Sequence, residues 1–197
     1  MKKNILLLIV SFCSIVYTSA QEEVAIDTSQ SVVNWSAAYS FEFGGHEGTV
    51  QFKEGAFLKT NNQIVGGTFL IDMSTIINTD GDYNDGLVEH LKDGDFFNIE
   101  KYPTAQLVIT KVKYHDPNNT PGSDKTYLRM EANLTIKGIT LPIMYESEIN
   151  AENTQMISRF KIDRTLWGIN FGAKGLSSKM KDRFISDAIE FEVTLNK

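Results

Sequence analysis

The stretch Leu128–Tyr145, "LRMEANLTIKGITLPIMY", carries the clearest structural signal in the chain: two runs of alternating apolar residues joined by a turn. Apolar side chains occupy every second position over residues 128–136, and again over residues 139–145. A period of two places one face of an extended strand against a core. Lys137-Gly138 separates the runs, and glycine accepts the positive φ that a tight hairpin requires. The stretch therefore predicts two neighbouring antiparallel strands.

The same alternation recurs elsewhere in the chain, which brings the number of predicted strands to eight. Pro142 indicates a sheet edge or a bulge in its strand, because proline has no N–H to donate. Strands with one apolar face, linked antiparallel, must close on themselves or pack on a second sheet. We therefore predict an all-β single domain. The other six strands are expected around Val33–Ala37, Val50–Phe52, Phe69–Met73 after the Gly66-Gly67 break, Leu107–Ile109, Phe160–Ile162 and Ile189–Leu195.

One short helix is expected between the third and fourth of these strands. Asp85 can cap a helix over residues 86–92, and Gly94 can end it. Phe96 and Phe97 follow directly, and two adjacent aromatic side chains suit a plug over one end of an apolar core. The segment predicts a single helix that closes one end of a barrel.

The first 20 residues have the features of a secretory signal peptide. Two lysines precede an apolar run over residues 5–17, and Thr18-Ser19-Ala20 provides small residues for cleavage after Ala20. The apolar run is shorter than the roughly 20 residues that a membrane-spanning helix needs, and no later apolar segment is longer. We expect a secreted domain over residues 21–197, without stable membrane insertion.

The mature chain is acidic and has no cysteine. Removing Lys2 and Lys3 from the 19 basic residues leaves 17 against 25 acidic ones, a net charge of about −8. Nucleic acids are recognised by basic surfaces, so a nucleic-acid partner is not expected. The only cysteine, Cys13, leaves with the signal peptide, so the domain depends on an ordinary core without disulfides.

Catalytic and metal-binding motifs are not found. The mature chain has no nucleophile motif and no zinc spacing of histidines. The segment Asn78–Glu89 imitates a calcium loop, but Tyr83 occupies the place that requires glycine, so a solvated acidic loop is expected. We predict no catalytic residues, no metal and no bound cofactor other than a possible lipid or quinone.

Three polar residues have both a functional and a structural interpretation. His46, within Gly44–Gly48, is either a turn histidine that faces water or a contact for a ligand headgroup at the barrel mouth. His90 suits a surface or structural pair with its neighbour. Arg164, next to Asp163, suits a structural ion pair that fixes the loop around Trp167.

Several blocks of the sequence resemble the YceI-like family of secreted lipid-binding proteins. They are "DTSQSVVNWSAAYSFEFGGHEGTVQFKEG" (27–55), "GGTFLIDMSTI" (66–76), "HLKDGDFFNIEKYPTAQL" (90–107), "ANLTIKGITLPI" (132–143) and "FKIDRTLWGINFG" (160–172). The resemblance implies a single eight-stranded antiparallel lipocalin-like barrel in the periplasm or outside the cell. It also implies an interior that holds a long isoprenoid lipid, such as a polyprenyl chain or a quinone tail.

The predicted apolar pocket consists of the inward alternates of the strands and of residues near one end. The alternation alone leaves open whether an eight-stranded barrel is filled by its own side chains or holds one slender ligand. An enzyme acting at the mouth and a filled barrel serving as an interaction module therefore remain alternatives, and so does a homodimer. The predicted pocket residues are Trp35, Phe52, Phe69, Ile71, Phe96, Phe97, Leu107, Ile109, Leu134, Leu141, Ile143, Phe160, Ile162 and Trp167, with His46 as the headgroup contact.

Overall fold

The computed structural model describes residues 20–40, 43–81, 84–115, 125–173 and 185–197, so the expected signal peptide lies outside the described residues except for Ala20. The described chain is mostly strand, with one α-helix and one short 3-10 helix, η1. The elements are β1 (Glu22–Ala25), β2 (Val32–Ala38), β3 (Gly45–Thr60), β4 (Gln63–Asn78), α1 (Asn84–Lys92), β5 (Thr104–His115), β6 (Lys125–Ile136), β7 (Ile139–Asn150), β8 (Gln155–Asp163), η1 (Arg164–Trp167) and β9 (Ala188–Asn196).

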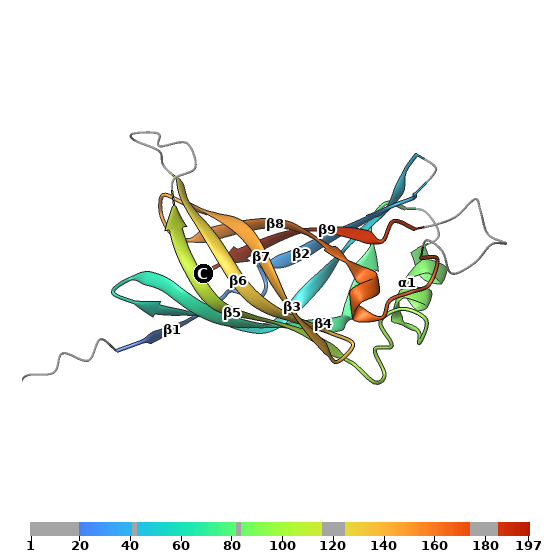
Figure 1. Cartoon of the computed structure of the whole chain (residues 1–197), viewed down its shortest axis with the longest axis horizontal. Coiled ribbons are helices and arrows are strands. Elements are labelled where there is room, and N and C mark those ends of the chain that lie inside the picture. The colour runs from blue at the N-terminus through green and yellow to red at the C-terminus, as the bar shows by residue number, and fades with distance from the viewer. Residues whose placement is uncertain (1–19, 41–42, 82–83, 116–124, 174–184) are drawn as a thin grey trace, which may run out of the picture.

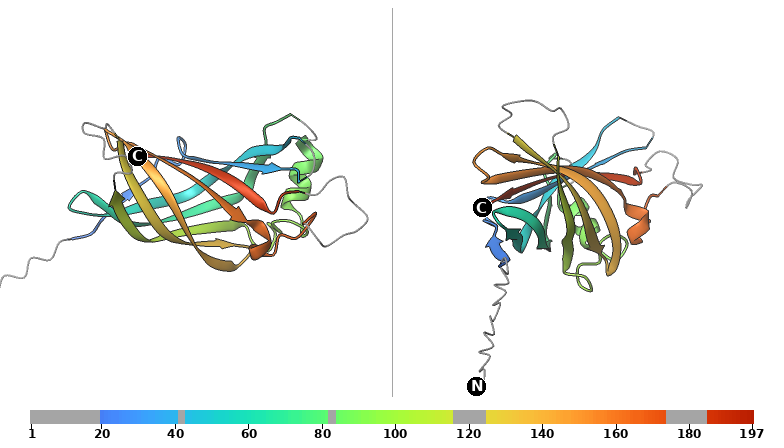
Figure 2. Two further views of the ribbon diagram at one scale, coloured as in Figure 1. Left: turned by 45° about the horizontal axis from the view of Figure 1, so that its top comes forward. Right: turned by 60° about the vertical axis from the view of Figure 1, so that its left-hand side comes forward.

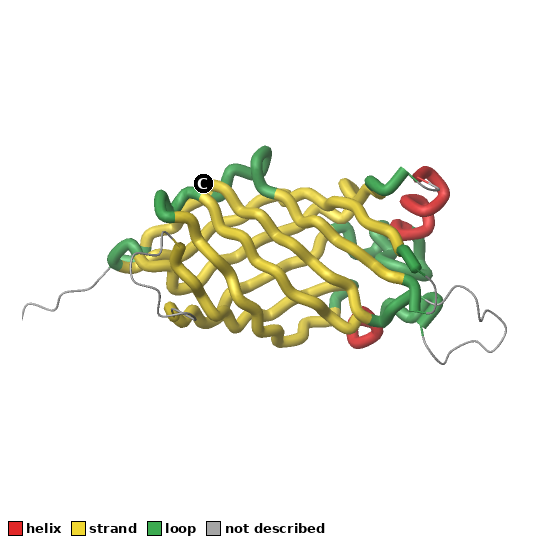
Figure 3. The backbone as a smooth tube through the Cα atoms, turned by 90° about the horizontal axis from the view of Figure 1, so that it is seen from above, coloured by secondary structure: helices red, strands yellow, loops and turns green. Residues whose placement is uncertain are grey.

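Eight of the strands form a closed antiparallel barrel, which confirms the predicted fold class (Figure 1). Neighbours follow the order β2-β9-β8-β7-β6-β5-β4-β3, and β3 also pairs with β2. The additional strand β1 was not predicted; it pairs with residues 56–59 of β3, beyond the part of β3 that β2 covers. Figure 3 shows the strands running obliquely around the wall, as closure of a barrel requires.

The two ends of the barrel differ in what covers them. Helix α1 and η1 lie at one end, together with the β2–β3 and β6–β7 turns, and the C-terminus lies at the opposite end (Figures 1 and 2). We call these the α1 end and the opposite end. Any ligand that enters at the α1 end therefore meets the helix and the residues that follow it.

The hairpin predicted at Lys137-Gly138 is confirmed. Lys137 has a φ of 49° and Gly138 a φ of 75°, and the residues on either side of the turn, Ile136 and Ile139, are register partners. Pro142 lies in the first half of β7, where β8 provides no register partner, because β7 pairs with β8 only over residues 146–149. The missing N–H of Pro142 is thus tolerated at a locally unpaired edge of the sheet.

The glycines of β3 and β4 are not breaks, contrary to the prediction. Gly66 and Gly67 lie inside β4, and Gly48 lies inside β3 opposite Trp35. A Cβ at Gly48 would stand 1.9 Å from the Ile77 carbonyl oxygen and 2.6 Å from Trp35 Cζ2. Glycine at position 48 is therefore required by the close packing of the indole ring on the strand.

Helix α1 begins two residues earlier than predicted, at Asn84, so Asp85 lies in its first turn instead of capping it. A carboxylate there still interacts favourably with the helix dipole. After the helix, the backbone N–H of Phe97 donates to the Leu91 carbonyl at 3.1 Å. This bond folds the chain back, so that the two phenylalanines stand beside the helix at the end of the barrel.

The interior of the barrel is filled at the opposite end. Phe57, Ile64, Leu128, Met130 and Met156 are almost completely buried there. Ser147 and Ser158 are buried among them and satisfy each other through an Oγ–Oγ hydrogen bond of 2.6 Å. The side chains thus close the opposite half of the barrel, and free space is left toward the α1 end.

Candidate ligand-binding site

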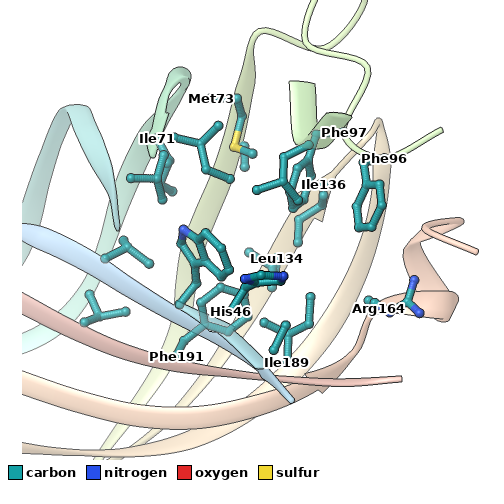
Figure 4. Close-up of a pocket in the computed structure, with 18 of the residues that line it drawn as sticks. His46, Ile71, Met73, Phe96, Phe97, Leu134, Ile136, Arg164, Ile189 and Phe191 are labelled. Carbon is teal, nitrogen blue, oxygen red and sulfur yellow. The ribbon is translucent and has the colours of Figure 1, made fainter. Parts of the chain in front are cut away.

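An apolar cavity of about 120 Å³ lies inside the barrel toward the α1 end (Figure 4). This volume is below the roughly 300–1,000 Å³ of typical small-molecule pockets. The side chains around it come from strands and from α1 and the segment that follows it. They are Val33, Trp35, Ala37, Tyr39, His46, Val50, Phe52, Ile71, Met73, Ile76, Leu87, Leu91, Phe96, Phe97, Ala105, Leu107, Leu134, Ile136, Phe160, Arg164, Ile185, Ile189, Phe191 and Val193.

The structure brings together more than half of the residues predicted from the sequence. Trp35, His46, Phe52, Ile71, Phe96, Phe97, Leu107, Leu134 and Phe160 all line the cavity. Their contact with a ligand remains a prediction. The two phenylalanines after α1 lie where the sequence placed them, against the α1 end of the apolar space.

The other predicted pocket residues lie elsewhere. Phe69 is buried behind Phe52, with the two ring centroids 6.2 Å apart. Ile109 and Ile162 are buried in the core without lining the cavity, and Leu141 and Ile143 are half-buried on β7. Trp167 is buried, and its Nε1–H donates to the Leu134 carbonyl at 3.1 Å, so this indole is a structural element of the wall.

Sequence reasoning missed more than half of the lining. Ile189, Phe191 and Val193 alternate along β9, a strand that was predicted, so the pattern could have included them. Leu87 and Leu91 are four residues apart on α1 and therefore share one face of the helix. Other missed residues also lie on the apolar face of predicted strands, so the same alternation could have included them: Val33, Ala37, Val50, Met73 and Ile136. The remaining missed residues lie outside the predicted alternation: Tyr39, Ile76, Ala105, Arg164 and Ile185.

A hydrogen-bonded chain of Tyr39, His46 and Asp80 stands at the α1 end of the cavity. The Tyr39 hydroxyl lies 2.8 Å from His46 Nε2, and His46 Nδ1 lies 2.8 Å from Asp80 Oδ2. The imidazole is only 18% exposed, so the interpretation as a turn histidine facing water is wrong. An ionised Asp80 can only accept, so Nδ1 carries a proton and donates to it.

Asp80 is fixed in turn by its surroundings. Its Oδ1 accepts from Asn78 Nδ2 at 2.7 Å, and its Oδ2 also accepts from the Glu47 backbone N–H at 3.3 Å. These contacts hold Asp80, in the loop after β4, in the position that orients His46. Within the described part of the chain, no group of three or more His, Cys, Asp and Glu side chains is arranged to hold a metal ion.

Arg164 is completely buried at the same end, and its donors are used by the protein. Its guanidinium donates to the carbonyls of Ile169, Phe171 and Ser186 over 2.7–3.1 Å. Burial lowers its pKa, and the nearby carboxylate of Asp187, 3.8 Å away, opposes that shift. The expected structural ion pair therefore involves Asp187, whereas Asp163 caps η1 by accepting from the Thr165 N–H.

Through these bonds Arg164 links the segment after η1, at Ile169 and Phe171, to the segment before β9, at Ser186. The chain just before β9 also contacts the end of β2. The Ser186 N–H donates to the Ala38 carbonyl, and Tyr39 and Ile185 form a β-bridge. His90, expected as a partner of its neighbour Glu89, instead packs edge-on against Phe96 and Phe171, at centroid distances of 5.0 and 4.3 Å. Both residues shape the α1 end and leave the cavity apolar.

The protein is thus a closed eight-stranded antiparallel β-barrel with an apolar cavity in its interior. Residues 24–196 match the model of the YceI-like domain. The chain therefore belongs to the YceI-like domain family, as the resemblance of its sequence blocks predicted.

Two solved structures share the fold of this chain. BcnA from Burkholderia cenocepacia has a TM-score of 0.58 and 16% identity, with 86% of this chain and 98% of BcnA covered. A polyisoprenoid binding domain from Saccharophagus degradans has a TM-score of 0.58 and 14% identity, covering 91% and 99%. At these identities the likeness concerns the fold alone.

A curated relative matches over a shorter segment. The UPF0312 protein plu2095 of Photorhabdus laumondii is 33% identical over 64 residues, which is 32% of this chain and 29% of that protein. In the described part of the chain, no helix is long and apolar enough to cross a membrane.

Proposed function

We propose that this protein is a secreted carrier or store for a long isoprenoid lipid, such as a polyprenyl chain or a quinone tail, which it holds in the cavity of the barrel. The observation that carries the proposal is the apolar cavity toward the α1 end, bounded by side chains of the barrel wall and of Phe96 and Phe97. Support also comes from the polyisoprenoid binding domain whose fold this chain shares. Each buried methylene of such a ligand would contribute about 0.8 kcal/mol.

A binding role is favoured over catalysis at the mouth. His46 is the histidine that lines the cavity, and both of its ring nitrogens are engaged by Tyr39 and Asp80. A barrel filled throughout is not favoured either, because side chains close only the opposite half. The apparent signal peptide supports a periplasmic or extracellular location as part of the proposal.

The test is lipid retention by residues 21–197, secreted by a bacterial host and purified without detergent. Organic extraction followed by mass spectrometry should recover a stoichiometric isoprenoid from the wild type. Ala105→Phe fills the cavity opposite Ile71, its register partner, and should abolish retention. Ala188→Phe places the same side chain on the exposed face of β9 and should retain the lipid.

Three outcomes separate the alternatives. Lipid in the wild type and in Ala188→Phe, but not in a folded Ala105→Phe, supports the proposal. Equal lipid in all three proteins places the ligand outside the cavity. An empty wild type that also refuses added isoprenoids overturns isoprenoid binding and favours an enzyme or an interaction module. Native mass spectrometry of the intact protein gives the stoichiometry and the oligomeric state in the same experiment.

A further inference from the structure

One residue of the cavity lining carries a buried donor that no described residue accepts. Trp35 lines the cavity and is only 7% exposed, and its Nε1–H has no hydrogen-bond partner among the described residues. A buried donor without a partner is uncommon in folded proteins and costs free energy. The other indole of the chain, at Trp167, has its donor satisfied by a carbonyl. The unused donor of Trp35 is therefore a feature that calls for an explanation.

Trp35 cannot easily turn its donor toward another protein group. It pairs with Gly48 on β3 and with Phe191 on β9, and the indole lies against Gly48, where any Cβ would come within 2.7 Å of Trp35 Cε2. Cε2 is the ring carbon bonded to Nε1. Packing against the bare backbone of β3 thus fixes the indole plane and with it the direction of the donor.

The other polar side chains of the lining already have partners. The guanidinium of Arg164 donates to backbone carbonyls, and Tyr39 and His46 bond each other. Apart from these side chains and the weakly accepting sulfur of Met73, the lining is hydrocarbon. A water molecule at the indole would find one donor and few other partners, whereas a buried water usually makes two to four hydrogen bonds.

We propose that the ligand of this barrel carries a neutral hydrogen-bond-accepting oxygen, such as a carbonyl, which accepts the Trp35 Nε1–H inside the cavity. This inference rests on the proposed isoprenoid-binding function and specifies the chemistry of the ligand. A hydroxyl group would bring a second donor into an apolar space, and a carboxylate would bring a charge that one neutral donor cannot compensate. A carbonyl or ether oxygen accepts the single donor and adds none.

The test compares two ligands of equal length with and without the oxygen. The probes are geranylgeranylacetone, an isoprenoid ketone, and the hydrocarbon in which a methylene replaces its carbonyl. Affinities are measured for the wild type and for Trp35→Phe, which keeps an aromatic ring and removes the donor. The ratio of ketone affinity to hydrocarbon affinity should fall by roughly five- to 100-fold in Trp35→Phe. Comparing ratios removes the difference in hydrophobicity between the probes.

Trp167→Phe is the matched control, since Trp167 does not line the cavity and its indole N–H already donates to the Leu134 carbonyl. It should leave the ratio unchanged. If the ratio is the same in the wild type and in Trp35→Phe, the inference is overturned while isoprenoid binding stands. If neither probe binds the wild type, the proposed function fails, and the inference fails with it.

A spectroscopic readout on the wild type avoids any dependence on how Trp35→Phe folds. The chain has two tryptophans, so its ¹H–¹⁵N spectrum should contain two indole cross peaks. The ketone should move the Trp35 proton downfield, as formation of a hydrogen bond requires, and the hydrocarbon should not. Equal shifts with both bound probes, or none with the ketone bound, would overturn the inference.

Discussion

Gly48 shows how a single residue without a side chain positions the site. Its backbone accommodates the Trp35 indole and the Ile77 carbonyl at distances that exclude a Cβ. The sequence could not reveal this role, because the surrounding glycines suggest a turn. The two strands that meet there become visible as partners only once their register is known.

Replacing Gly48 by alanine should destabilise the protein by about 3 kcal/mol or more, because the new methyl group overlaps both Trp35 and the Ile77 carbonyl. Gly86→Ala is the matched control. Gly86 lies in α1, and nothing stands within 4 Å of the place that a Cβ would take, so alanine there should stabilise by roughly 0.5–1 kcal/mol. Chemical denaturation of both variants checks the two signs, and a neutral Gly48→Ala would contradict the close packing.

Lys197 makes the stability of the protein depend on pH. Burial, then a hydrogen bond and repulsion from the buried Lys59, lower the pKa of Lys197 to about 8. The folded state therefore releases this proton at lower pH than the unfolded state, whose lysine has an ordinary pKa near 10.5. The cost of keeping Lys197 charged in the folded state is fully present below pH 8. The free energy of unfolding should therefore rise from pH 8 to about 10.5.

In Lys197→Met this rise should be smaller by on the order of 1 kcal/mol, after allowance for solvent screening of a half-buried group. Lys113→Met, on the exposed side of β5, should keep the wild-type slope. Urea denaturation at pH 7.5, 9 and 10.5 measures the slopes. The assignment of the slope to Lys197 is refuted when Lys197→Met and Lys113→Met behave alike.

Among the elements, the segment from α1 to Phe97 closes the α1 end of the cavity. Leu87 and Leu91 line the cavity from the helix, and Phe96 and Phe97 line it from the turn that follows. The segment contributes apolar surface without adding a strand to the barrel. It could therefore change shape without disturbing the ladders of hydrogen bonds in the wall.

Phe97→Asp should abolish lipid retention, because a carboxylate would be placed at the boundary of the apolar space. Phe43→Asp is the control, since Phe43 is fully exposed at the turn between β2 and β3. Extraction and mass spectrometry give the lipid load, and circular dichroism checks folding. A folded Phe97→Asp with an unchanged load would refute the role of this segment.

The elements could be predicted well where the pattern is local. The hairpin at Lys137-Gly138 and all eight barrel strands follow from alternation and turn chemistry, and α1 was predicted to within two residues. Strand β1 was missed because it is short and mostly exposed, so it has no apolar face to detect. The pairing of Arg164 with Asp187 was missed because its partner is distant in sequence.

At the scale of the whole molecule, the interior is divided into a filled half and a half with free space. Alternation shows which side chains point inward, but it does not show how far each reaches across the barrel. Phe69 and Ile109 were predicted to line the pocket for this reason, although they belong to the packed core behind it. The position of the cavity depends on how side chains from opposite strands meet, and no single segment of sequence records that.

The division predicts a limit to the length of the ligand. Phe52 lines the cavity at its inner end, and Phe69 and Phe57 pack edge-on behind it, with centroids 6.2 Å apart between Phe52 and Phe69 and 5.1 Å apart between Phe69 and Phe57. Affinity for isoprenoids of increasing length should rise by about 0.8 kcal/mol per buried methylene and then level off. Phe52→Ala should move the plateau to longer chains, at a cost in stability of about 3–5 kcal/mol.

A displacement assay with isoprenoids of about 10, 15, 20 and 30 carbons, roughly one or two isoprene units per step, would locate the plateau. Val65→Ala, on the exposed side of β4, should leave the plateau unchanged. If the longest chain that Phe52→Ala binds is the same as for the wild type, these three aromatic rings do not set the limit.

The short pairing between β7 and β8 gives the barrel wall an uneven resistance to stretching. Only residues 146–149 of β7 have register partners in β8, and toward the α1 end the two strands share none. Widening the barrel there would break no ladder hydrogen bond between these strands, but it would cost the packing of Tyr145 on Phe160, the packing around Trp167 and the hydrogen bond from the Trp167 indole to Leu134. At the α1 end, where the cavity lies, the barrel wall is therefore elastic between β7 and β8. The other strand pairs keep the rest of the circumference rigid.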